Sequence, residues 1–369
     1  MSSSSSGSLD GLECLREASG PLRIVFIGDS LARYMYLALA LLVEYPTWGT
    51  SSLISDVIGP TKQANPLQCD PDHLQKYWSQ IPASVRIPLN ATPGCVPERV
   101  AQFVPKSHHQ FWAAPDLHWQ TWYRLSNQAL GGREQCDCAR TSNMAIENRR
   151  YTNGSLVLEF FFWGGWREVV GSLSWDPSQV ANLSCGPGRG IGNASGHLQP
   201  TWSKSAADIL RSLINGGTHP THVFIGNDDW FDVPRFGEHA DPNKYDWADL
   251  AAAARHVHVR TNATVVWRTT PQPLAELLAN RMYRNATRRS VHRHGPNAFA
   301  RVGLPTFEGA EMADRLQHDL KRHGGRPSAG WSMPGSAYFS RDAMHLSPAG
   351  TLSQASELGR RYVCGTGPN

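Results

Sequence analysis

The sequence has few charged residues and almost no surplus of either sign. Asp, Glu, Lys and Arg make up 18% of the 369 residues, and the formal net charge is only +4. Apolar residues make up 40%, enough for a hydrophobic core and too much for a disordered chain. No nucleic-acid-binding motif surrounds the basic stretch 281–293, so we expect no nucleic-acid partner and interpret it as a solvated loop. A basic face toward an acidic glycan or a membrane surface is the alternative.

Long apolar runs are also missing. No stretch reaches the ~20 uninterrupted apolar residues that a membrane-spanning helix needs, and the longest, residues 34–43, predicts a buried helix. The first eight residues are mostly Ser and lack the apolar region of a signal peptide. We therefore expect residues 1–20 to be a disordered linker or the truncated N-terminus of a longer protein. In the second case, a signal peptide or a membrane anchor could precede the sequence.

Metal-binding spacings of cysteine and histidine are absent. The seven cysteines are Cys14, Cys69, Cys95, Cys136, Cys138, Cys185 and Cys364. None forms a CxxC pair, so we expect up to three disulfides and one free thiol, with Cys136 and Cys138 in different bridges. The HxH pairs at 256–258 and 292–294 lack an identifiable third ligand, and we predict no metal site.

Glycosylation motifs are more frequent than chance allows. The sequence N-x-[S/T] occurs six times, against about two expected by chance. The acceptors are Asn90, Asn153, Asn182, Asn193, Asn262 and Asn285. We expect Asn182 and Asn193 to lie on an exposed loop. Together with the cysteines, this excess predicts a chain of the secretory pathway, in the Golgi lumen or outside the cell.

Apolar runs that predict strands alternate with helical periodicity. Strands are expected at 22–27, 156–163, 222–225 and 263–268. Helices are expected at 31–45, 203–215 with a Ser203 cap, 249–259, 308–323 and after Pro348, which follows a Ser347 cap. This alternation predicts a three-layer α/β/α sandwich with a central parallel sheet. We expect one domain over 21–369 with a loop-rich insertion at about 49–150.

Polar or glycine residues follow three of the predicted strands. They are Ser30, Gly164-Gly165 and Asn227. In parallel sheets the carboxyl ends of the strands carry the site, so these residues are the first candidates for chemistry. A hydroxyl at a helix N-terminus, as at Ser30, suits a nucleophile, although an ordinary helix cap is the better explanation of this motif taken alone.

A second candidate group lies near the C-terminus. Asp342 and His345 have the i, i+3 spacing at which a carboxylate can orient an imidazole that faces a nucleophile. An incidental surface His is the alternative. With Ser30, these residues make a nucleophile, base and orienting acid in a plausible order, and the Asn227 amide adds an oxyanion donor.

Three blocks of the sequence resemble conserved blocks of the SGNH (GDSL-type) hydrolase superfamily. They are residues 24–30 (IVFIGDS), 226–228 (GND) and 342–350 (DAMHLSPAG). Arg33 after GDS, and the stretch at 265–271, are similar to the PC-esterase branch, which holds trichome-birefringence-like and Cas1-type O-acetyltransferases. The resemblance covers about 21–48 and 156–362. It departs at Ile225, where the family's Gly-x-Asn-Asp motif has its first Gly, and the chain has no plant-type cysteine-rich N-terminal domain.

The resemblance implies a role for each matching residue. Ser30 would be the nucleophile, His345 the general base and Asp342 its orienting acid. The Ser30 backbone N–H, Asn227 and either Gly164 or Gly165 would form the oxyanion hole. Residues expected to bind substrate are Asp29, Arg33, Trp163, Trp166, Trp230 and Arg268, with core packing as the alternative for the tryptophans.

The expected function is transfer of an acyl group to a glycan hydroxyl through a serine acyl-enzyme. Acetyl is the expected acyl group. A polysaccharide or glycan is the acceptor, an acyl donor such as acetyl-CoA or an acetylated carrier is the co-substrate, and no metal or organic cofactor is expected. The first alternative is a secreted carbohydrate or lipid esterase of the same type, in which water takes the acyl group. The second is an inactive glycan-binding protein of the same fold.

Overall fold

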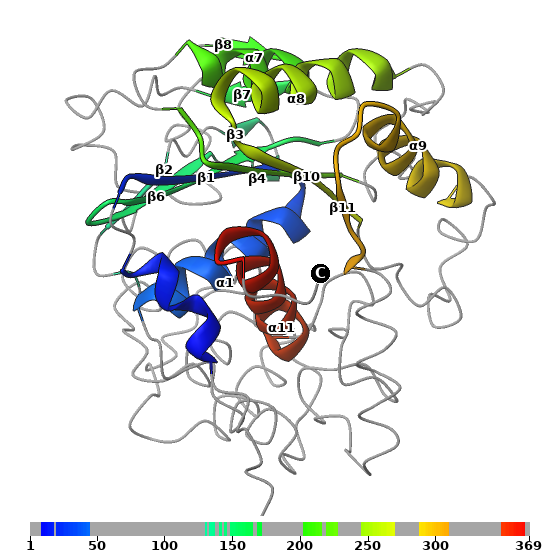
Figure 1. The fold of residues 1–369 in the computed structure, drawn as a ribbon. Coiled ribbons are helices and arrows are strands. Elements are labelled where there is room, and N and C mark those ends of the chain that lie inside the picture. The colour runs from blue at the N-terminus through cyan, green and yellow to red at the C-terminus, as the bar shows by residue number, and fades with distance from the viewer. Residues whose placement is uncertain are drawn as a thin grey trace, which may run out of the picture.

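The computed structural model describes several segments of the chain (Figure 1). They are residues 9–17, 20–44, 130, 133–136, 140–141, 144–145, 148–164, 168–171, 202–215, 219–227, 245–269, 288–309 and 348–365. Almost all of the helix expected at 308–323, and the sequons at Asn90, Asn182, Asn193 and Asn285, lie outside these ranges.

A mixed sheet forms the centre of the fold. Its strands are β1 (Leu22–Gly28), β2 (Glu134–Cys136), β5 (Arg149–Asn153), β6 (Leu156–Phe162), β9 (His222–Gly226), β10 (Thr264–Arg268) and β11 (Thr306–Phe307). Their order is β11-β10-β9-β1-β6-β5-β2. The first five strands of this order are parallel, and β5 and β2 extend the sheet in antiparallel pairing. Two short ribbons lie beside it: β3 (Arg140–Thr141) with β4 (Met144–Ala145), and β7 (Val169–Gly171) with β8 (Trp202–Lys204).

Helices cover both faces of this sheet. In Figure 1, α1 (Ser30–Glu44) and α11 (Pro348–Leu358) lie below it, and α7 (Ala206–Ile214), α8 (Trp247–Thr261) and α9 (Arg288–Arg301) lie above and beside it. The short helices η1 (Leu9–Leu15) and η10 (Gly359–Val363) complete the described elements. The prediction of an α/β fold with a largely parallel sheet is therefore confirmed.

The side chains of the central strand alternate between two cores. Ile24 and Phe26 join the core beneath the sheet, together with α1 and α11, whereas Val25 and Ile27 join the core above it. A strand that is buried on both faces needs apolar residues at every position, which explains the unbroken run in β1. The predicted buried helix is confirmed as well, because every residue from Leu31 to Val43 of α1 is buried. Among the described residues, no helix has both the length and the apolar character needed to cross a membrane.

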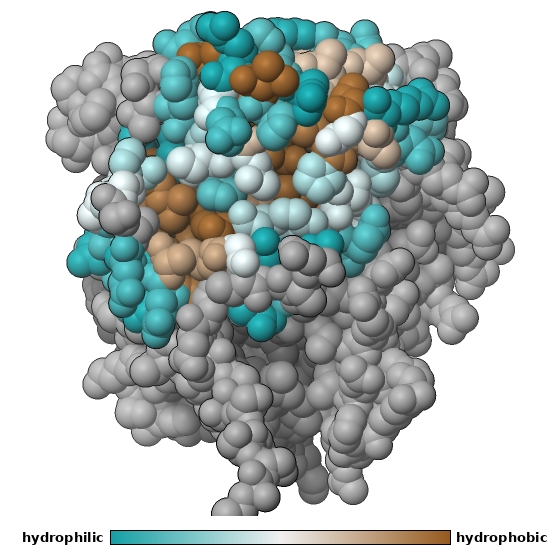
Figure 2. Space-filling model, viewed as in Figure 1, coloured by the Kyte–Doolittle hydropathy of each residue, from teal (hydrophilic) through white to brown (hydrophobic). Residues whose placement is uncertain are grey.

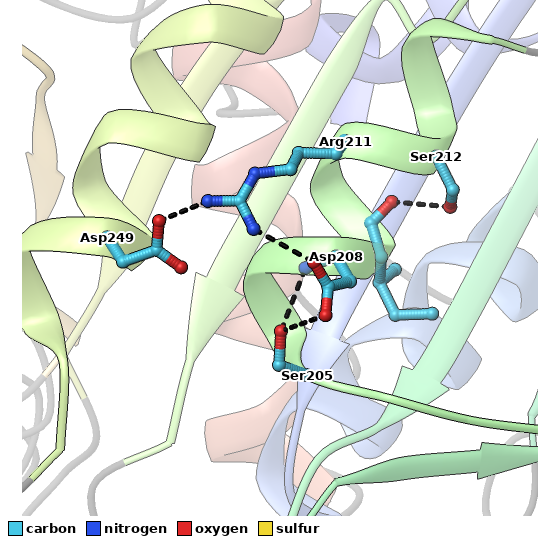
Figure 3. A network of polar contacts seen from close by, with 6 residues as sticks. Ser205, Asp208, Arg211, Ser212 and Asp249 are labelled. Carbon is cyan, nitrogen blue, oxygen red and sulfur yellow. Dashed lines mark hydrogen bonds and ion pairs between the residues drawn. The ribbon is translucent and has the colours of Figure 1, made fainter.

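The cap of α7 differs from the predicted one. Ser203 lies in β8, and Ser205 caps the helix instead, its hydroxyl accepting from the Asp208 backbone N–H at 3.0 Å. Arg211 of α7 then bridges Asp208 and Asp249, which joins α7 to α8 (Figure 3). The Ser205 hydroxyl and the Arg211 guanidinium both lower the pKa of the Asp208 carboxyl. The bridge is exposed, so it orients the two helices more than it stabilises them.

Three segments depart from the sequence-based expectations. The later part of the basic stretch, predicted as a solvated loop, begins α9, which continues through Pro296. Residues 9–15, expected in a disordered linker, form η1 and bury Leu12 and Leu15. At the end of the expected insertion, residues 134–136 and the first residues of β5 pair onto the central sheet.

One disulfide joins the two ends of the described chain. Cys14 of η1 bonds to Cys364 at the end of η10, across 350 residues of sequence. Leu12 packs closely against Gly359 in the same region. The bond therefore fastens the C-terminal helix to the N-terminal segment.

This geometry predicts that Cys14→Ser lowers the free energy of unfolding by about 2–5 kcal/mol, because the bond closes a very long loop. Denaturant unfolding without reductant measures the loss. The double variant Cys14→Ser/Cys364→Ser should lose no more than the single one. An unfolding midpoint of the natural chain that is unchanged by reductant would contradict the assignment.

Candidate active site

The carboxyl ends of three neighbouring strands meet at one edge of the sheet. In the register of the sheet, Gly28 of β1 lies opposite Phe162 of β6 on one side and opposite Gly226 of β9 on the other. The residues that follow these strands therefore leave the sheet at the same level. The structure thus brings together Asp29, Trp163 and Asn227, the first residues after these three strands.

Gly28 lets two strands and a helix approach one another at this edge. A Cβ atom built on Gly28 would lie 2.1 Å from the carbonyl oxygen of Gly226 and 2.7 Å from the Cβ of Ala32. Contacts this short are impossible for any residue with a side chain. The glycine of the Gly-Asp-Ser motif is thus required by the close approach of β9 and of the first turn of α1.

Asp29 fixes where α1 begins. Its buried Oδ1 accepts hydrogen bonds from the backbone N–H groups of Leu31 at 2.9 Å and Ala32 at 3.3 Å. The first intrahelical bond runs from the Arg33 N–H to the Asp29 carbonyl oxygen at 3.1 Å. The capping interpretation of this motif therefore holds for Asp29, and it makes Ser30 the first residue of a 15-residue helix. The positive end of the helix dipole lies at that residue.

Asn227 connects the ends of β9 and β6. Its Nδ2 donates to the backbone carbonyl oxygen of Trp163, whose own N–H donates to the Gly28 carbonyl oxygen at 2.7 Å. Because a carbonyl can only accept, this contact fixes the orientation of the amide. The amide nitrogen has a second hydrogen, and no acceptor for it is found among the described residues.

Two buried arginines lie beneath the same edge. The Arg268 side chain is 1% exposed, and its Nη2 lies 3.9 Å from Oδ1 of Asp29. The Arg33 guanidinium lies over the Phe162 ring, 5.6 Å from its centroid. Asp29, Arg33, Arg268 and Trp163 have almost no exposed surface, so in this structure these four of the six residues expected to bind substrate contact other parts of the protein.

Aromatic and hydroxyl groups that the sequence analysis did not select also lie near this edge. The ring of Tyr245 lies 5.6 Å from that of Trp163, and burial raises the pKa of Tyr245, so its hydroxyl stays neutral. Thr269 is buried directly after β10, and its hydroxyl contacts the Phe307 carbonyl oxygen at 3.1 Å. Thr269 follows its strand as Asn227 follows β9, so the same strand-end criterion would have found it.

The C-terminal helix runs antiparallel to the parallel strands. Gln354 Nε2 of α11 donates to the carbonyl oxygen of Gly309, just after β11, at 2.7 Å. Further along, the Tyr362 hydroxyl donates to the carbonyl oxygen of Thr306, where β11 starts, at 3.2 Å. The first residue of α11, Pro348, therefore lies toward the carboxyl edge, where Asp29 and Asn227 also lie.

The described histidines do not provide an alternative base at this edge. Burial lowers the pKa of His222 to about 4, but His222 begins β9, at the opposite edge of the sheet. The Nδ1 of His258 lies 2.7 Å from the Ala263 carbonyl oxygen at the end of α8. Within the described segments, no three His, Cys, Asp or Glu residues gather to hold a metal ion.

The remaining predicted site residues divide into two groups. Gly164 follows Trp163 and is buried. Gly165, Trp166, Trp230, Asp342 and His345 lie outside the described residues. Their roles, like the oxyanion role of Asn227, stay predictions.

The cap geometry predicts that Asp29→Ala lowers the free energy of unfolding by about 2–3 kcal/mol, since it removes an N-cap and a buried carboxylate beside Arg268. Asp29→Asn keeps an oxygen acceptor and should cost about 1 kcal/mol less. Urea unfolding measures both variants. Ser205→Ala, which removes the exposed cap of α7, is the matched control at about 1 kcal/mol. A loss for Asp29→Ala no larger than that of the control would show that the carboxylate acts only as a cap.

No known family model matches this chain, and searches of curated proteins and of solved structures also find no match. The resemblance to the SGNH superfamily therefore depends on three short motifs. The edge of the sheet formed by β1, β6 and β9 is therefore the structural basis for a proposed function.

Proposed function

We propose that this chain is an SGNH-type serine acyltransferase that O-acetylates glycan hydroxyls. One observation supports it most: the start of α1 at Ser30 follows the same edge of the sheet as the residues directly after β6 and β9, with the Asn227 amide bonded to the Trp163 carbonyl. A hydroxyl at a helix start and an amide donor on the neighbouring strand are the parts that acyl transfer needs.

The position of Ser30 supports its role as nucleophile. The N-terminus of α1 carries a partial positive charge, which stabilises negative charge that develops on the serine oxygen and on the tetrahedral intermediate. Asn227 has a second amide hydrogen that no described acceptor takes, and we assign it to an oxyanion. Removal of a single donor of this kind costs roughly 10²–10³-fold in turnover in a serine protease.

Chain connectivity supports His345 as the base. His345 precedes Pro348 by three residues, so their Cα atoms are at most about 11 Å apart. Pro348 begins a helix whose N-terminus lies toward the carboxyl edge. Asp342 precedes His345 by three residues and is the carboxylate proposed to orient its imidazole.

The proposed reaction has two balanced steps. In the first, the Ser30 oxygen bonds to the acyl carbon as His345 takes its proton, and the donor leaves with that proton as its bond to the acyl carbon breaks. In the second, the sugar hydroxyl loses its proton to His345 and bonds to the acyl carbon, the bond between that carbon and the Ser30 oxygen breaks, and His345 returns the proton to Ser30. Acetyl-CoA or an acetylated carrier is the donor, and an esterase differs only in using water in the second step.

The compartment also favours a glycan acceptor. The Cys14–Cys364 disulfide is typical of an oxidising environment. Asn262, one of the six sequon asparagines, is exposed at the left-handed C-cap of α8, where attachment of a sugar would displace no packed group. We therefore place the activity in the secretory pathway.

A serine-reactive phosphonate should label Ser30, because the proposed mechanism activates only that hydroxyl. Peptide mass spectrometry locates the adduct. Ser30→Ala should abolish labelling and turnover, whereas the matched control Ser205→Ala should keep both. Equal labelling of the Ser30→Ala variant, or none of the natural chain, would leave the inactive glycan-binding protein as the better explanation.

Transfer should outcompete hydrolysis when an acceptor is present. An acceptor held in line reaches an effective molarity of ~10⁵ M or more, which overcomes the excess of water. We expect p-nitrophenyl acetate to be hydrolysed slowly, and an added oligosaccharide to raise donor turnover and to become O-acetylated. Trp166→Ala, which removes a predicted acceptor contact, should lower transfer more than hydrolysis. If hydrolysis is fast, and neither the acceptor nor the Trp166→Ala substitution changes its rate, the protein is an esterase.

A further inference from the structure

A cavity of about 450 Å³ lies between α8 and α9. Ala248 and Ala251 of α8 and Ala298 of α9 line it, and we call this group the alanine floor. In the space-filling view, apolar and hydrophilic surface lie side by side over these upper helices (Figure 2). A cavity of this size and composition suits a small organic ligand.

The two helices cannot close this cavity by moving together, because Trp267 of β10 sets the position of α9. A Cβ atom built on Gly295 of α9 would lie 2.2 Å from the Trp267 ring. The Phe299 ring, one turn later, lies 5.0 Å from the same ring. The alanines that face each other at Ala251 and Ala298 are too small to fill the remaining space, so the cavity is already formed.

One wall of the cavity is a fixed aromatic pair. The Trp247 and His294 rings lie nearly parallel, with an angle of 12° and centroids 6.0 Å apart. Trp247 also makes edge contacts with Tyr245 at 4.9 Å and Trp267 at 5.8 Å. A ring held from three sides loses little conformational entropy when a ligand packs against it.

Three polar side chains converge on the cavity from one face of α9. His294, Asn297 and Arg301 follow one another at i, i+3 and i+7, which places them on the same side of a helix. Among the described residues that line the cavity there is no carboxylate. Among the described residues, no hydrogen bond or ion pair engages the exposed Arg301 guanidinium. The polar side therefore offers a cation and an amide to an anionic group.

We infer that this cavity binds a small carboxylic acid with an apolar body about one ring in size. The carboxylate pairs with Arg301, a geometry that guanidinium groups favour. The apolar body lies on the alanine floor against the Trp247–His294 wall, and Asn297 receives a polar substituent. The inference depends on neither the nucleophile nor the proposed acyl transfer.

Calorimetric titration of the full chain with benzoate tests this inference, with benzamide as the neutral probe of the same shape. We expect a Kd for benzoate on the order of 0.1–1 mM, and binding of benzamide at least ~10-fold weaker. Arg301→Gln should weaken benzoate binding at least ~10-fold and bring it close to that of benzamide. Arg260→Gln is the matched control, because Arg260 is also exposed in the last turn of its helix and lies on the opposite face of α8 from Ala251.

A variant that fills the cavity distinguishes the contribution of the Arg301 charge from that of the cavity volume. Ala248 is exposed and lines the cavity, so Ala248→Phe should fill it and abolish binding of both probes, with an unchanged circular dichroism spectrum. The inference is overturned if benzoate does not bind by about 10 mM, or if Arg301→Gln and Ala248→Phe both bind it as the natural chain does. Tighter binding of D-glucuronate than of benzoate would overturn the assignment of an apolar body.

Discussion

The parallel pairing of β1 with β6 on one side and with β9 on the other is the constraint on which the candidate site depends. This pairing aligns Gly28, Phe162 and Gly226 at one level, so Asp29, Trp163 and Asn227 leave the sheet together. At Gly28 the neighbouring Gly226 and Ala32 lie so close that no residue with a Cβ atom fits. A one-residue shift of β1 would reverse which of its side chains face each core and would separate Ser30 from Asn227.

Buried polar contacts then fix the positions of the residues at this edge of the sheet. The Asp29 carboxylate caps α1 and lies beside Arg268, and the Asn227 amide holds the Trp163 carbonyl. Groups this buried orient their neighbours at little entropic cost, because the surrounding packing already fixes them. The rigid part of the proposed machinery therefore lies in the sheet edge, where Arg268 lies beside the carboxylate of Asp29, the residue that precedes Ser30.

The sequence revealed the central sheet because its strands are buried on both faces and are therefore continuously apolar, as at residues 22–28. It also revealed the convergence of the strand ends, which follows from parallel pairing. It did not reveal α9, whose basic residues and Gly295-Pro296 pair suggest a loop, although packing of Gly295 on Trp267 retains the helix. The Cys14–Cys364 pairing was beyond prediction as well, because spacing alone does not determine which of seven cysteines meet.

The proposed mechanism requires Ser30 to carry the acyl group during the reaction. The most direct measurement is an acid quench of the protein during turnover of p-nitrophenyl acetate, followed by mass spectrometry of its peptides. The mechanism predicts one acetyl group on the peptide that contains Ser30. This group should be lost when an acceptor glycan is added before the quench, and it should be absent from Ser30→Ala. Acetyl groups found only on other residues, or equally in that variant, would contradict it.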